Sequence, residues 1–130
     1  MEKLQFYIIF NKSLDILKIL KIMDKFRFEN MWRGWFVGDF EPSAFKTKKF
    51  EVGFGIHKKG DKWHKHYHKI ATEITLIVKG KVKVNDEIFS KGDIFIIKPN
   101  EISDPLFLED TEYVVVKTIS DINDKYIIER

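Results

Sequence analysis

Apolar and polar residues alternate along most of the chain with the two-residue period of β-strands. The alternation is clearest over residues 50–56, where Phe50, Val52, Phe54 and Ile56 share one phase. The expected strands from residue 34 onward are 34–40, 50–56, 63–68, 73–78, 81–84, 87–89, 94–97 and 112–118. Short turns containing glycine, proline, asparagine or aspartate separate them. Many short strands at this spacing predict an all-β sandwich or barrel.

The first thirty residues follow a different pattern. Residues 4–10 predict a strand, and residues 13–26 predict an amphipathic helix with a narrow polar stripe. We expect a single domain over residues 1–130, with this strand and helix in 1–30, the barrel in 31–120 and a tail in 121–130. The exposed strand edge and the wide apolar helix face favour a homodimer that covers both.

The apolar N-terminal run is short, and Lys18 and Lys21 interrupt it before it could span a membrane. No small-residue cleavage site follows it, so we expect a cytoplasmic protein without a membrane partner.

Composition narrows the possible chemistry. The 130 residues are 44% hydrophobic, which is enough for a core without cross-links. The chain has 0 cysteines, which excludes disulfides, thiolate metal sites and a cysteine nucleophile. A net charge of +3 is a mild excess and gives no reason to expect a nucleic-acid partner.

Three of the 4 histidines lie at alternate positions in one expected strand. His64, His66 and His68 therefore project from the same face. Imidazole is a common ligand of transition metals, and Glu73 is the nearest carboxylate after the histidines. Two imidazoles and one carboxylate leave coordination positions open, as catalytic metal sites do.

The spacing of five residues resembles the first motif of the cupin superfamily at every position. These residues are Gly60, His66, His68, Glu73 and Gly80. The resemblance covers residues 50–118. It implies a double-stranded β-helix, the jelly-roll barrel of cupins. It also implies that His66, His68 and Glu73 hold one divalent ion inside the barrel, of Fe, Mn, Zn or Ni.

The second cupin motif is only partly kept. It begins well at Gly92, but Pro99 comes one residue late, and the motif's second glycine and its asparagine are missing. Counted from Pro99, the place of the ligand histidine falls on Asp104; counted from Gly92, it falls on Ser103. Asp104 is therefore either a fourth ligand or an outer hydrogen-bonding partner of the site. Alternatively it points to solvent before Pro105, and the site has three protein ligands.

The resemblance implies a metal-dependent enzyme that acts on a small anionic or carbohydrate-type metabolite, with isomerase, lyase and dioxygenase chemistry all open. The alternative is a non-catalytic cupin that binds a small ligand. Candidate proton-transfer residues are His64 and Tyr67, together with a lysine. Five lysines crowd the segment that carries the histidines and either attract an anion or form a solvated surface. They are Lys58, Lys59, Lys62, Lys65 and Lys69.

Two further features leave alternatives open. His57 lies at the polar phase of its strand and could face the barrel interior. An aromatic group before the barrel either walls a pocket or belongs to the core. Its members are Trp32, Trp35, Phe36 and Phe40. The polar segment 121–126 suggests no chemistry.

Overall fold

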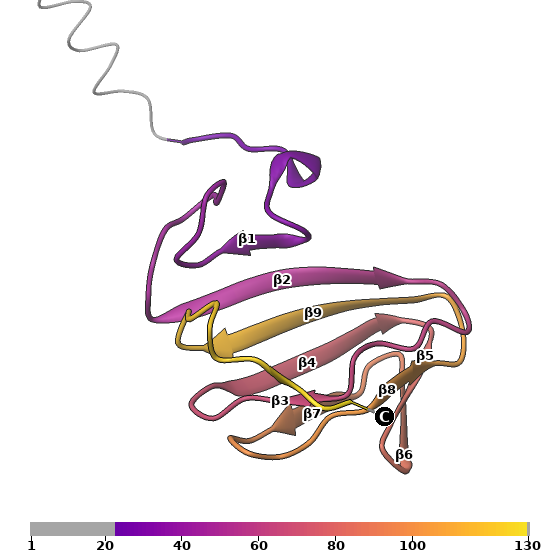
Figure 1. Ribbon diagram of the computed structural model, residues 1–130. Helices are drawn as coiled ribbons and strands as arrows, with labels where there is room; N and C mark the ends of the chain where they lie inside the picture. Colours follow the sequence, from indigo (N-terminus) through magenta and orange to yellow (C-terminus); the bar gives the residue numbers. More distant parts are fainter. Residues whose placement is uncertain (1–22, 130) are drawn as a thin grey trace, which may run out of the picture.

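Ten β-strands and one turn of 3-10 helix make up the secondary structure of residues 23–129, the part of the chain that the computed structural model describes (Figure 1). The elements are η1 (Phe28–Asn30), β1 (Trp35–Val37), β2 (Phe50–His57), β3 (His66–Tyr67), β4 (Thr72–Lys79), β5 (Lys81–Val84), β6 (Glu87–Ser90), β7 (Ile94–Ile97), β8 (Pro105–Phe107), β9 (Thr111–Thr118) and β10 (Tyr126–Ile127). The prediction of an all-β fold is confirmed.

The expected N-terminal strand and most of the expected helix lie outside the described residues. The last four residues of that helix, 23–26, are described and are not helical. No helix among residues 23–129 is long and apolar enough to cross a membrane.

The larger sheet has five antiparallel strands in the order β1-β2-β9-β4-β7. Strands β2, β9 and β4 pair over most of their length, so their residues form rows across the sheet. One row places Lys117 of β9 between Glu51 of β2 and Glu73 of β4. Side chains in one row share a face, so this register gathers three charged groups on one side.

The second layer combines a three-stranded sheet, β6-β5-β8, with the two-stranded sheet β10-β3. The N–H groups of His66 and Ser103 donate to each other's carbonyls at 2.9 and 2.8 Å, which joins the two sheets. After β9, the C-terminal segment crosses in front of the larger sheet to pair with β3 (Figure 1). A small core closes one end of the barrel. It consists of Ile77, Val82, Val84 and Phe107.

Two turns follow from local chemistry. The loop Asn85–Asp86 joins β5 to β6 as a two-residue hairpin, and Asn85 has a φ of 56°, a value that asparagine tolerates. Gly80 has a φ of 87°, and a Cβ there would lie 2.2 Å from the carbonyl oxygen of Asp110. Only glycine fits this connection between β4 and β5.

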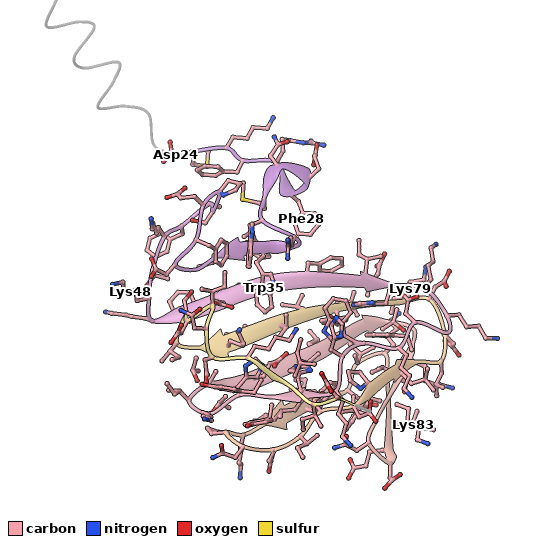
Figure 2. The ribbon with its side chains drawn as sticks, in the orientation of Figure 1. Asp24, Phe28, Trp35, Lys48, Lys79 and Lys83 are labelled. Carbon is pink, nitrogen blue, oxygen red and sulfur yellow. The ribbon has the colours of Figure 1, made fainter. Side chains whose placement is uncertain are left out.

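The inward face of the larger sheet carries several polar residues, whereas its outward face is largely apolar. On β2, Glu51 faces the interior and is buried, whereas Ile56, on the opposite face, is 60% exposed. The outward phases of β9, β4 and β7 are also mostly apolar: Val114, Val116, Ile74, Leu76, Val78, Ile94 and Ile96. At the β1–β2 end, Phe28 of η1 packs edge-on against Phe36 and Phe54 and covers part of this face (Figure 2).

Candidate metal centre

His66, His68 and Glu73 meet inside the barrel. The two histidines come from β3 and the residue following it, and Glu73 lies near the start of β4. One potential ligand atom from each side chain lies within 4.8 Å of the other two. Both histidines are buried and the carboxylate is partly buried. Among residues 23–129 this is the one group of three or more candidate ligands with such geometry.

Backbone carbonyls orient both imidazoles. Nδ1 of His66 lies 2.6 Å from the carbonyl oxygen of His64, and Nδ1 of His68 contacts the carbonyl oxygen of Asp124. A carbonyl only accepts hydrogen bonds, so each Nδ1 carries the proton. In the neutral ring the Nε2 lone pair is then free to bind a metal, which is the usual arrangement of metal-ligating histidines.

The donor set fits a cation. Nε2 of His68 lies 3.1 Å from Oε2 of Glu73. In the neutral ring this Nε2 has only a lone pair, and the carboxylate has only acceptors, so neither group can donate a hydrogen bond to the other. Two electron-rich groups this close need a positive charge between them, either a proton on His68 or a bound metal ion. His66 adds a third nitrogen to the same space. The arrangement could provide three ligands to an ion and would leave coordination positions for a small molecule.

The charge states suit metal binding. Burial alone raises the pKa of Glu73, but the hydrogen bond with His68 and the charges of His68, His66 and Lys117 outweigh it. The pKa of Glu73 therefore lies below its usual value. Burial lowers the pKa of His66, more than the His64 carbonyl and Glu73 raise it. A carboxylate and a neutral imidazole at neutral pH are the forms that a metal ion requires.

A buried ion pair lies beside the three ligands. Nζ of Lys117 is 3.0 Å from Oε2 of Glu51, and both side chains are nearly inaccessible to solvent. The hydroxyl of Ser120 donates to Oε1 of Glu51 at 2.9 Å and accepts the N–H of Asp39 at 2.7 Å. The ammonium of Lys117 also lies 5.2 Å from the centroid of the Trp35 ring. Both charges are thus fully partnered, as buried charges must be.

A cavity of about 640 Å³ contains the ligands at its polar end. Its volume lies within the range of small-molecule sites. His57 lines the cavity, stacked on Phe107 at 4.0 Å, with Nε2 3.3 Å from the hydroxyl of Tyr113 and Nδ1 3.4 Å from Asp61. Burial lowers the pKa of His57, although Asp61 opposes the shift. Burial, reinforced by Glu73, raises the pKa of Tyr113, so its hydroxyl stays protonated.

The C-terminal segment completes the site. The carboxylate of Asp124 accepts N–H groups from all three residues of the turn that follows His68, residues 69–71, at 2.9–3.2 Å. The carbonyl of the same residue orients His68. Lys125 follows it and lines the cavity, 5.1 Å from the Trp63 ring centroid. Desolvation lowers the pKa of Lys125, and the Glu73 carboxylate opposes this shift.

Solved structures share this architecture. The fold is similar to a double-stranded β-helix protein from Klebsiella pneumoniae subsp. pneumoniae, with a TM-score of 0.62 and 17% identity over 85% of this chain and 96% of the other. This chain has the cupin fold. It is also similar to KdgF from Halomonas sp., with a TM-score of 0.52 and 20% identity over 58% of this chain and 74% of that one.

A third similar structure contains a metal. The bacterial pirin YhhW from Escherichia coli, solved with nickel(II), has a TM-score of 0.59 and 15% identity, covering 70% of this chain and 41% of the pirin. No family model and no curated protein matches the chain. At these identities the likeness establishes the cupin fold, and the chemistry has to be argued from the site.

The structure brings only part of the predicted cupin site together. His64 is exposed and contributes its carbonyl oxygen to His66, while its side chain does not line the cavity. Tyr67 stacks on Tyr126 at 5.2 Å, also outside the cavity lining. His57, by contrast, faces the interior, which was one of the alternatives that its strand phase left open.

Asp104 lies beside the cavity wall and is not part of the ligand group. Its neighbours Ser103 and Pro105 line the cavity, and Asp104 does not. Its N–H donates to the side-chain oxygen of Asn85 at 3.0 Å. This placement supports the alternative of three protein ligands, because Ser103 rather than Asp104 has the inward phase.

The five clustered lysines of residues 58–69 do not line the cavity, whereas Lys117 and Lys125 do. Neither of these two lysines was predicted from the sequence to take part in the site. The position of Lys117 directly after the apolar run 114–116 could have indicated a buried charge, but segment 121–126 carried no indication of a role for Lys125. Of the aromatic group, Trp32 and Trp35 line the cavity and Phe40 is buried.

Proposed function

We propose that this chain is a metal-dependent cupin enzyme that acts on a small anionic or carbohydrate-type metabolite. Nε2 of His66, Nε2 of His68 and the carboxylate of Glu73 would hold one divalent ion, of Fe, Mn, Zn or Ni. The observation that carries the proposal is the approach of His68 Nε2 and Glu73 Oε2 to 3.1 Å, with both imidazoles already fixed through Nδ1. This is the arrangement that metal-ligating histidines adopt.

A divalent ion supplies a Lewis acid that polarises a carbonyl or carboxylate oxygen. The chain supplies the surroundings. Apolar side chains such as Phe107 and Val115 exclude water from the cavity. His57 is placed to accept a proton, because its pKa is lowered and its ring faces the cavity beside the Tyr113 hydroxyl. We propose His57 for the proton-transfer role, since His64 and Tyr67 lie outside the cavity lining.

Metal analysis tests the proposal. Wild-type protein titrated with Ni²⁺ or Mn²⁺ should bind one ion per chain by calorimetry. His66→Ala should lower the affinity by more than about 100-fold, beyond the 10- to 100-fold typical for residues that only support a ligand. His64→Ala is the matched control from the same segment, because its exposed side chain does not line the cavity.

Two results would reject this assignment: a wild-type protein that binds no divalent ion, or equal losses in His66→Ala and His64→Ala. Turnover of small organic acids and sugars by the loaded protein separates the enzyme from the non-catalytic alternative. His57→Phe should lower that turnover at unchanged metal affinity, because phenylalanine keeps the stacking on Phe107.

A further inference from the structure

The charges that line the cavity do not balance once a divalent ion is present. Lys117 and Glu51 neutralise each other in their ion pair. Glu73 offsets half of the charge of a divalent ion at the proposed site. Two cations that line the cavity remain: Arg33, whose guanidinium lies 5.6 Å from the centroid of the Trp32 ring, and Lys125. Among residues 23–129, the ammonium of Lys125 forms no ion pair or hydrogen bond with another side chain. The polar end of the loaded cavity is therefore net positive and favours an anion.

The backbone on both sides of Lys125 is held in place. Asp124, immediately before it, is bonded to the turn after His68 through its carboxylate and to His68 itself through its carbonyl. Tyr126, immediately after it, pairs with Tyr67 in the β10–β3 sheet. The chain that positions Lys125 is therefore the same chain that orients a proposed metal ligand. Lys125 is exposed where the cavity meets solvent, and its ammonium lies over Trp63.

We propose that Lys125 binds the carboxylate of a small organic acid. A second oxygen atom of the same molecule would reach the proposed ion at His66, His68 and Glu73. This inference rests on the proposed metal site. A singly charged carboxylate matches the one unpaired ammonium of the cavity, because Lys117 is already paired with Glu51 and the guanidinium of Arg33 lies over the Trp32 ring.

Calorimetry on the Ni²⁺-loaded protein tests the role of Lys125 with glycolate and its uncharged amide, glycolamide. Lys125→Met should weaken glycolate binding by about 10- to 100-fold, the effect of losing a hydrogen bond to a charged group. Glycolamide binding should change by less than about 3-fold, since the amide carries no charge for the ammonium to attract. Lys125→Arg should restore most of the glycolate affinity. Lys69→Met is the control, because Lys69 lies over the Tyr126 ring and does not line the cavity.

The Ni²⁺ affinity of each variant is measured first, so that the two proposals can fail separately. Wild-type protein that binds no Ni²⁺ overturns the metal site. If Ni²⁺ binds normally, the inference about Lys125 fails in any of three cases: loaded wild-type protein does not bind glycolate at millimolar concentration, Lys125→Met binds it as well as wild type, or Lys125→Met loses glycolate and glycolamide equally.

Discussion

Replacing Asp124 with asparagine should destabilise the protein and weaken its metal site together. The buried carboxylate accepts the N–H groups of Lys69 and Ala71 at 2.9 Å and shares that of Ile70 between its two oxygens. Asparagine keeps one acceptor and turns a donor toward the N–H of Ala71, a residue that is 2% exposed. An unsatisfied buried N–H costs about 1–3 kcal/mol, and loss of charge weakens the remaining bonds, so we expect about 2–4 kcal/mol less stability.

The pH dependence identifies the carboxylate as the cause. Burial raises the pKa of Asp124, but the N–H groups of Ala71, Lys69 and Ile70 and the charge of His68 outweigh it, so its pKa in the folded protein is lowered. A lowered pKa stabilises the fold above the unfolded value, about 3.9, and this contribution disappears as the pH falls through the folded value. The difference between wild type and Asp124→Asn should therefore be full at pH 7 and shrink below about pH 4.

Urea denaturation at pH 7 and at decreasing pH measures both effects. Asp121→Asn is the control from the same segment, because the bond that its carboxylate accepts from the Asn123 N–H is exposed, and it should cost less than about 1 kcal/mol. Metal affinity should fall by about 10-fold in Asp124→Asn alone, because the carbonyl of Asp124 orients His68. A loss of stability below 0.5 kcal/mol (about the size of a neutral surface substitution), or a loss that does not shrink in acid, would refute the reasoning.

Three further predictions follow from the site and the sheet. Metal affinity should fall at low pH because protons compete with the ion for His66. Since the pKa of His66 is lowered, this loss should occur below pH 6.5, the usual histidine value, in Ni²⁺ titrations from pH 8 to 5. Lys117→Met should cost about 3–5 kcal/mol in urea denaturation by leaving Glu51 without its counter-charge, and adding Glu51→Gln should recover part of the loss. The homodimer remains a prediction: sedimentation at micromolar concentration should give twice the chain mass, and Ile94→Lys with Ile96→Lys should weaken the dimer if the apolar outer sheet face contributes to it.

The cluster of His66, His68 and Glu73 could be predicted because the three residues are close in the sequence. His66 and His68 are two residues apart, and Glu73 follows across one turn, so strand alternation and motif spacing were sufficient to group them. The same alternation gave His57 its inward phase. Strands β5 and β7 have the predicted bounds because clear turn residues flank them.

The second motif shows where spacing fails. Successive residues of a strand face opposite sides. A shift of one residue in the alignment with the motif therefore changes whether Ser103 or Asp104 is expected to face the site. The sequence counts from Gly92 and from Pro99 differ by one, and the structure places Ser103 inward. What fixes the register is the pair of backbone hydrogen bonds between Ser103 and His66, a contact between residues 37 positions apart.

Lys117 and Lys125 could not be assigned because their neighbours are distant in sequence. Lys117 acquires its role from strand pairing with β2 and β4, which places it between two carboxylates. Lys125 depends on β10, a strand of two residues that no periodicity can reveal. Strand β8 was missed for a related reason, since it is short and begins at Pro105.

The polar residues of the larger sheet that face the barrel interior link the fold to the candidate site. Because Glu51, Lys117 and Glu73 face the interior, this part of the sheet buries less apolar surface. The core of Ile77, Val82, Val84 and Phe107 occupies only one end of the barrel. The polar end must instead be stabilised by satisfied charges: the Lys117–Glu51 pair, the Asp124 contacts and the positive charge that His68 and Glu73 require between them. Any ion bound only by the folded protein adds to stability by mass action. In this cupin fold the residues proposed to bind the metal and its ligand are therefore also part of what holds the two layers together.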